Sequence, residues 1–260
     1  MSYNKINPIL IAKKLAHSLG IENVWSIDIA DLIVYHNGIV KEVDLNNCDG
    51  RLVMKDGRSI VSIDSKIEYP QRKRYVLAHE LGHILMHGDR EASFTDDDST
   101  LDAYKNGPQE KEANDFAAEL LMPSDLFKAS CLKKKFTPDL IRELSKKFNT
   151  SLTSVVYRFL EFGNHPIAAF YSKNGKIQYW KKSEDLKWWI PDKNKLDVPS
   201  DSVANEFFAY NRIYPKADSS QEISRSTWFD LGKYDSDGPM YEFCIITPRY
   251  NSVLSVVWES

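Results

Sequence analysis

The chain of 260 residues lacks several features that mark particular classes of protein. Its three cysteines, Cys48, Cys131 and Cys244, are widely spaced and never form a C-x-x-C pair. An odd, scattered set argues against a disulfide framework and against a zinc site built from cysteines, and it fits a reducing cytoplasm. No segment approaches the roughly 18 consecutive apolar residues of a membrane-spanning helix, so we expect no membrane span.

An excess of one charge is absent as well. The formal net charge is -3 and the pI is near 6.1, so the chain has no overall basic character favouring nucleic acid or an anionic membrane. Pro8, Lys13 and Lys14 interrupt the N-terminal segment before an apolar export signal can form. These absences predict a water-soluble cytoplasmic protein, and nothing in them sets its oligomeric state.

What is present is an ordinary globular composition, with 42% hydrophobic and 27% charged residues. Apolar residues at helical spacing predict a helix over residues 8–19, a largely buried helix from Gln71 to about His87, and a helix that begins at Gly107-Pro108 and ends before Pro123. Asp56-Gly57 between alternating apolar segments predicts a β-hairpin over residues 51–64.

The character of the sequence changes near Gly163. Residues 138–148 and 152–161 predict two helices, whereas the part beyond Gly163 contains short strand-like segments, which are residues 167–171, 176–180, 242–246 and 253–257. We therefore expect an α+β protein of two domains. Residues 1–163 form a mainly helical domain with a small hairpin, including the helix pair at 137–161, and residues 164–260 form an α+β domain that regulates it or handles the substrate.

The motif His79-Glu80-Leu81-Gly82-His83 predicts a metal site on the second of these helices. Two histidines four residues apart project from one face of a helix, separated by about 40° of rotation and about 6 Å of rise, so both rings can reach one ion. Glu80 is turned by about 100° from His79, beside the ion's open position, where it can take a proton from water. His79 and His83 are thus predicted metal ligands and Glu80 the catalytic base.

A catalytic zinc site needs a third protein ligand. His87 lies on the same face of its helix, but about 12 Å of rise separates it from His79, which is too far to share one ion. The helix that begins at Gly107 offers four acids, and its apolar stripe does not choose among them. Glu110 and Glu112 flank opposite edges of that stripe, so either can point inward, and both can equally be solvated acids of a first helical turn.

Two runs, Arg74 to His83 and Glu112 to Pro123, resemble the motifs of the ImmA/IrrE family of metallopeptidases, and the hairpin near Gly50 to Val53 extends the likeness. The resemblance implies a zincin-like domain that binds Zn2+ through two histidines and a glutamate, as in thermolysin-like enzymes. Matching the family's Glu-Ala-Asn run selects Glu112 as the third ligand. Asn114 belongs to the same run, and two roles are open for it. It can form an ordinary surface or capping hydrogen bond, or it can hold a metal ligand in place through a hydrogen bond.

The resemblance also implies a function: a zinc-dependent endopeptidase that cleaves a helix-turn-helix repressor and so releases genes of stress responses or mobile elements. The alternative is a non-catalytic regulator that binds DNA or protein and has a structural zinc site. Glu80 separates the two, because hydrolysis needs a base beside an open metal position whereas a structural site has no use for one.

The helix pair at 137–161 resembles a helix-turn-helix, and direct binding to DNA is therefore an alternative for this segment. Its apolar residues, among them Ile141, Leu144, Phe148, Val155 and Phe159, look like a packed core. Since the chain as a whole has no basic bias, we favour a structural role or docking of a repressor.

Overall fold

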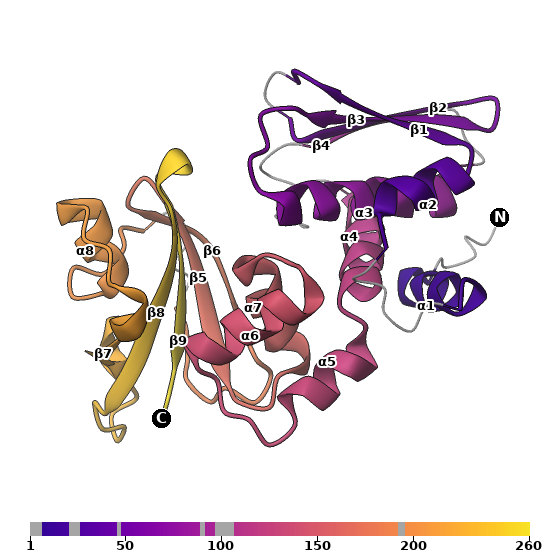
Figure 1. The fold of residues 1–260 in the computed structure, drawn as a ribbon. Helices are drawn as coiled ribbons and strands as arrows, with labels where there is room; N and C mark the ends of the chain where they lie inside the picture. Colours follow the sequence, from indigo (N-terminus) through magenta and orange to yellow (C-terminus); the bar gives the residue numbers. More distant parts are fainter. Residues whose placement is uncertain (1–6, 21–26, 46–47, 89–91, 97–106, 192–195) are drawn as a thin grey trace. The chain divides into compact units, whose positions relative to one another are not determined.

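The computed structural model of the chain describes residues 7–20, 27–45, 48–88, 92–96, 107–191 and 196–260. Within these residues the fold is α+β, with eight α-helices and two β-sheets, which confirms the predicted class (Figure 1). None of the described helices is both long enough and apolar enough to cross a bilayer. Contacts divide the chain into two compact units, and each is treated by itself below.

The first unit comprises Met1–Leu126 and Lys146–Ser151, and its sheet has the strand order β1-β3-β2-β4. In chain order its elements are α1 (Pro8–Ser18), α2 (Ile29–Tyr35), β1 (Gly38–Val43), β2 (Gly50–Lys55), β3 (Arg58–Asp64), α3 (Pro70–His87), β4 (Ala92–Asp96) and α4 (Gly107–Leu121). The predicted hairpin is confirmed as β2 and β3, joined by Asp56 and Gly57, which both have positive φ. It is the centre of a larger sheet than the sequence predicted, because β4 pairs antiparallel with β2 and β1 pairs parallel with β3.

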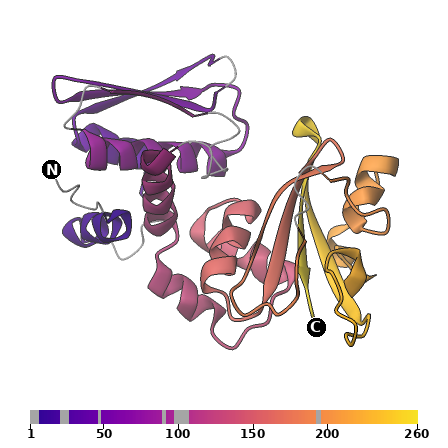
Figure 2. The same ribbon diagram turned by 180° about the vertical axis from the view of Figure 1, so that it is seen from behind.

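One face of this sheet forms the core of the unit. Burial alternates along β2, so that Leu52 and Met54 point inward together with Val61 and Ile63 of β3. They join a buried cluster with Val76, Leu77 and Leu81 of α3. Figures 1 and 2 show α2 and α3 beneath this face of the sheet. The sheet therefore buries one side of α3 and leaves the other side of that helix for α4.

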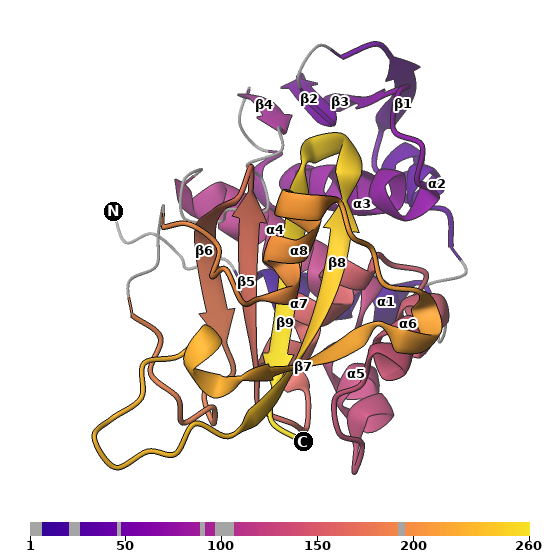
Figure 3. The same ribbon diagram turned by 90° about the vertical axis from the view of Figure 1, so that its left-hand side faces the viewer.

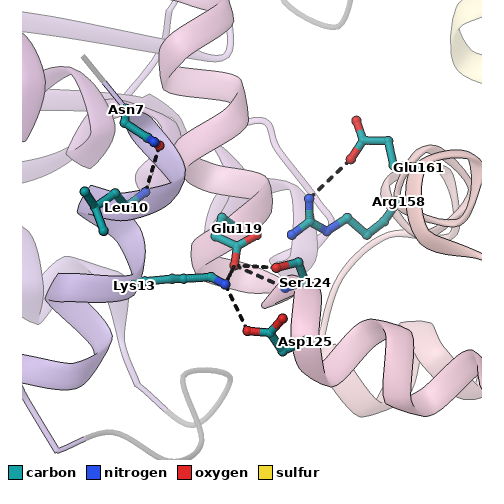
Figure 4. A network of polar contacts seen from close by, with 8 residues as sticks. All are labelled: Asn7, Leu10, Lys13, Glu119, Ser124, Asp125, Arg158 and Glu161. Atoms are coloured by element: carbon teal, nitrogen blue, oxygen red, sulfur yellow. Dashed lines mark hydrogen bonds and ion pairs between the residues drawn. The ribbon is translucent and has the colours of Figure 1, made fainter. Parts of the chain in front are cut away.

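Helix α1 packs against α4 and forms polar contacts near the C-terminal end of α4. Glu119, which is buried, accepts hydrogen bonds from the amide and the hydroxyl of Ser124, at 3.2 and 3.0 Å. Lys13 of α1 lies 3.8 Å from a Glu119 oxygen and donates to Asp125 at 2.9 Å, as Figure 4 shows. These contacts fix where α4 ends, and α4 contributes residues to the site described below.

The second unit comprises Phe127–Ser145 and Leu152–Ser260 and contains an antiparallel five-stranded sheet of order β6-β5-β9-β8-β7. Its elements are α5 (Ser124–Cys131) and α6 (Pro138–Phe148), which both extend across a unit boundary, then α7 (Leu152–Phe162), β5 (Ile167–Lys173), β6 (Lys176–Lys182), α8 (Val203–Tyr210), β7 (Ser220–Ser224), β8 (Pro239–Thr247) and β9 (Ser252–Trp258). Strands β5, β6, β8 and β9 contain the four predicted strand segments. The central strand β9 is buried at all seven residues.

Helices cover both faces of this sheet. Figure 3 shows α8 in front of the sheet and α7 behind it. Glu242 of β8, fully buried, accepts hydrogen bonds from the amides of Val203 and Ala204 at the start of α8, at 2.9 and 3.1 Å, and from the indole of Trp228 at 3.1 Å. This carboxyl group satisfies the first amides of α8 and joins the helix to the sheet.

The unit boundary differs from the domain boundary that the sequence predicted near Gly163. Most of the segment between residues 127 and 162 belongs to the second unit. The ring of Phe136, just before α6, lies 4.6 Å from that of Trp258 in β9 and 5.3 Å from that of Phe159 in α7. The helices therefore share a core with a strand far along the chain, and the local change in composition at Gly163 does not reveal that contact.

Candidate metal centre

The predicted metal motif lies in the middle of α3. This helix starts with Pro70 in its first turn, where the missing amide costs nothing, and it ends at His87. All the residues from Val76 to His83 are buried, and His79, Glu80 and His83 are 0% exposed. Burying two imidazoles and a carboxyl group is costly unless each has polar partners, so such a cluster indicates a function.

Small residues let α3 and α4 approach each other closely. Gly82 faces Ala113 and Phe116 of α4, and a β-carbon added at Gly82 would lie 2.9 Å from Phe116 Cδ1 and 3.3 Å from Ala113 Cα. Ala78 of α3 and Ala117 of α4 are also fully buried. At this separation the side chains of one helix reach the functional groups of the other.

Three side chains from the two helices converge at this point. His79 Nε2 lies 3.0 Å from His83 Nε2 and 3.1 Å from Glu110 Oε2, and His83 Nε2 lies 3.4 Å from Glu110 Oε1. One ligand atom from each residue lies within 4.8 Å of the others, and it is the one such group of three found among the described residues. Two imidazoles and one carboxylate are a donor set typical of a zinc site with an open fourth position.

Asn114 orients His79 toward this group. Its Oδ1 accepts hydrogen bonds from His79 Nδ1 at 3.0 Å and from the Tyr75 hydroxyl at 2.6 Å. Because Nδ1 donates to an amide oxygen, the neutral imidazole has its lone pair on Nε2, the atom that faces His83 and Glu110. Histidines that bind metals are commonly fixed in this way through their second nitrogen. The open question about Asn114 is answered: it contacts a predicted ligand.

Glu110 is held in its charged form. Burial acts to raise its pKa, but when the two rings are protonated their hydrogen bonds and positive charges outweigh that effect and lower the pKa of Glu110 to about 2. An anionic oxygen pair therefore faces two ring nitrogens in a mostly buried position. The residues present fit a divalent cation.

Glu112, the third ligand selected by the resemblance, lies elsewhere. Its Oε2 is 3.5 Å from Nε2 of His87, one helical turn beyond His83. Burial raises the pKa of Glu112, and the nearby Asp115 carboxylate acts in the same direction. Two residues along a helix correspond to a rotation of about 200°, so Glu110 and Glu112 cannot face one point together. The structure therefore brings Glu110, and not the predicted Glu112, together with His79 and His83.

Sequence reasoning left Glu110 open and missed Tyr75. A usable signal was present for Glu110, because Asn114 follows it by four residues and the two therefore share one side of α4. That is the spacing of His79 and His83 on α3. No comparable pattern marks Tyr75, which reaches the site through its contact with Asn114.

Comparison with known proteins finds a family match that spans both helices of this site. Residues 39–160 match the family model Peptidase_M78, described as the IrrE N-terminal-like domain. The radiation response metalloprotease IrrE of Deinococcus deserti is 30% identical over 112 residues, a match that covers 42% of this chain and 38% of that protein. The match thus spans well under half of the relative's length.

A solved structure, a Mycobacterium tuberculosis transcriptional regulator, is similar with a TM-score of 0.59 at 13% sequence identity. The similarity covers 98% of this chain and 78% of that chain, and at such low identity it concerns the fold alone.

Proposed function

Because residues 39–160 belong to the ImmA/IrrE family of metallopeptidases, we propose that the chain is a zinc-dependent endopeptidase with its active site between α3 and α4. The observation that supports this most directly is the convergence of His79, His83 and Glu110, with Glu80 buried on the same helix. His79, His83 and Glu110 are the proposed zinc ligands. Two histidines of an H-E-x-x-H helix together with a glutamate support a zincin-like site in this proposal.

The residues of the chain have separate roles in this proposal. When bound, zinc acts as a Lewis acid that polarises the carbonyl group of the scissile peptide bond. Glu80 follows His79 directly and is turned by about 100° around the helix, so it stands beside the ligands rather than among them. It accepts the proton of the attacking water and returns it to the leaving amine. Asn114 keeps Nε2 of His79 directed at the ion.

The proposed substrate is a folded protein of the helix-turn-helix repressor type, cleaved to switch on genes of a stress response or a mobile element. This part rests on the family alone. Helices α6 and α7 bury Ile141, Leu144, Val155 and Phe159. Such apolar faces support a structural or docking role for the pair in preference to reading DNA.

The test is cleavage of candidate helix-turn-helix proteins, chosen from the genomic neighbourhood, by the zinc-loaded chain and by its Glu80→Gln form. Intact-mass measurement locates any cut, and the metal content of both forms is measured in parallel. We expect cleavage by the parent alone, with equal metal in both forms, because the amide of glutamine cannot accept the proton.

Two other outcomes would change the assignment. Equal cleavage by both forms would remove Glu80 from the role of base. If both forms bind zinc and neither cuts any partner, the chain belongs with the alternative class, a regulator that binds protein or DNA and uses its metal for structure.

A further inference from the structure

The outer face of the β1-β3-β2-β4 sheet has a row of exposed apolar side chains. Ile39 of β1 pairs with Ile60 of β3, and Ile60 pairs with Val53 of β2, so the three lie side by side across adjacent strands. They are 54%, 40% and 43% exposed. The opposite face already packs on α3, so this row contributes nothing to the core of its unit, and exposed aligned apolar residues of this kind are typical of binding surfaces.

Basic side chains stand on both sides of the apolar row. On one side, Lys41 and Arg51 flank Ser62 in the next row of paired residues. On the other side, Arg58 pairs with Lys55 beside the hairpin turn. All four cations are exposed. Each basic row lies about 7 Å from the apolar row, which is two residues along a strand.

These cations are largely unneutralised. Lys41, Lys55 and Arg58 form no ion pair with any acid of the part of the chain that the structure describes. Asp64, the acid at the end of β3 on this face, accepts hydrogen bonds from the amides of Leu45 and Lys66. The face is thus apolar along its middle and positively charged along both borders, although the chain as a whole has a net charge of -3.

We propose that this face binds an acidic segment of a partner protein, whose apolar side chains cover Ile39, Ile60 and Val53 and whose carboxylates pair with the flanking cations. Complementary charge on both borders sets the position of the segment, and the apolar row excludes water beneath it. A nucleic acid fits less well, since its phosphates would lie over aliphatic groups and the row offers no aromatic ring for a base to stack on. An anionic bilayer fits less well too, because this row has no Trp or Phe to insert.

The proposal is tested with the full chain in its Glu80→Gln form, so that a bound peptide is not cut. A display library of short random peptides is selected on the immobilised protein, and enriched peptides are synthesised with a fluorescent label. We expect enrichment of peptides that combine Asp or Glu with Leu, Ile, Val or Phe, and weaker binding at higher salt. Fluorescence anisotropy then gives their Kd.

Two variants of the face are compared with two matched controls. The first variant combines Lys41→Glu with Lys55→Glu, and the second is Ile60→Ser. Each weakens the binding of the acidic peptides by about 10-fold or more. The controls, Lys14→Glu with Lys146→Glu and the exposed Val34→Ser on α2, leave Kd within about two-fold. Since every changed side chain is exposed, thermal unfolding checks that all variants stay folded.

Three outcomes overturn the proposal. The first is a selection without enrichment of acidic peptides, and the second is binding that survives in both face variants. The third is that duplex DNA or phosphatidylserine vesicles bind the parent and lose binding in the face variants while the acidic peptides do not. None of these outcomes depends on whether the chain cleaves a substrate.

Discussion

At the scale of single residues, the metal centre depends on which acid α4 turns toward α3. Glu110 and Asn114 are four residues apart and lie on the same side of α4, one beside the histidine nitrogens and the other behind His79. Glu112 lies on the other side, next to His87. The proposed ligand Glu110 and Asn114, which contacts the proposed ligand His79, thus come from successive turns of one helix.

Replacing Glu110 and Glu112 in turn distinguishes their roles. Glutamine keeps the size of the side chain but removes the charge that a divalent ion needs, so Glu110→Gln weakens zinc binding by more than about 100-fold. Glu112→Gln, the matched control, leaves it within a few-fold. Competition with a chromogenic chelator measures both, and the reverse order would restore Glu112 as the third ligand.

A change at Asn114 tests the orientation of His79. Asn114→Ala frees the ring to rotate and to change tautomer, so zinc affinity falls by about 10- to 100-fold, while Asn114→Asp, which still accepts from Nδ1, retains affinity. Asp115→Ala on the same helix, which removes an exposed ion pair with Lys111, serves as the control. If Asn114→Asp lost as much zinc affinity as Asn114→Ala, Asn114 would not act by orienting His79.

Sequence alone was sufficient to bring His79 and His83 together, because their spacing within one helix fixes their directions. The role of Glu80 stays a prediction. Sequence alone was insufficient for the third ligand. The side of α4 that turns toward α3 depends on how α4 packs against Gly82, and the periodicity of α4 alone does not determine it. The family resemblance then selected Glu112, whereas the structure brings the neighbouring acid Glu110 to the two histidines. Which turn of α4 meets α3 is a tertiary property.

At the scale of elements, the separation of α3 and α4 sets the geometry of the site. Exchanging a helical glycine for alanine ordinarily gains up to about 1 kcal/mol. Here the added methyl group would meet the buried ring of Phe116 at 2.9 Å. We therefore expect alanine at this position to decrease the stability instead of increasing it.

Gly82→Ala lowers the free energy of unfolding by about 1–3 kcal/mol and weakens zinc binding, because the helices must move apart. Chemical denaturation and chelator competition measure the two effects. In the double variant Gly82→Ala with Phe116→Leu, the smaller side chain at position 116 leaves space for the added methyl group. The loss of unfolding free energy in the double variant is therefore smaller than the sum of the losses in the two single variants. Strictly additive losses would show that the contact does not limit the approach.

The attachment of α8 to its sheet predicts a dependence on pH. Burial raises the pKa of Glu242 despite the hydrogen bonds that it accepts. A carboxyl group with a raised pKa binds more protons in the folded than in the unfolded state between the two pKa values. Its contribution to stability is complete below the ordinary pKa of 4.5 and decreases as the pH rises through the folded pKa.

The variant Glu242→Gln has no such titration. The free energy of unfolding of the parent minus that of the variant should therefore fall as the pH is raised from about 4.5. Tryptophan fluorescence reports on this unit, since five of the six tryptophans lie beyond residue 163. A difference that stays constant or increases with pH would exclude a raised pKa.

At the scale of the whole molecule, the proposed zinc ligands and the proposed catalytic base all lie in the first unit, and each unit has its own core. The sequence predicted the α+β class and most helices and strands from local spacing. It did not predict that residues 127–162 pack mainly with the C-terminal sheet, since that depends on Phe136 meeting a strand more than a hundred residues later.

Zinc should therefore stabilise the two units unequally. Calorimetry of the metal-free chain should give two transitions, and free zinc at about 100 times its Kd should stabilise one of them by about 2.7 kcal/mol. Glu110→Gln should abolish this shift without moving the other transition. Equal shifts of both transitions would mean that the units unfold together.

The position of β9 has a consequence for biosynthesis. It follows every other strand of the five-stranded sheet in the sequence, yet it lies at the centre, between β5 and β8. While the ribosome is still translating residues 252–258, the pairs β5-β6 and β7-β8 have no strand to join them. A nascent chain stalled before Ser252 would thus expose two unpaired strand edges to chaperones and proteases.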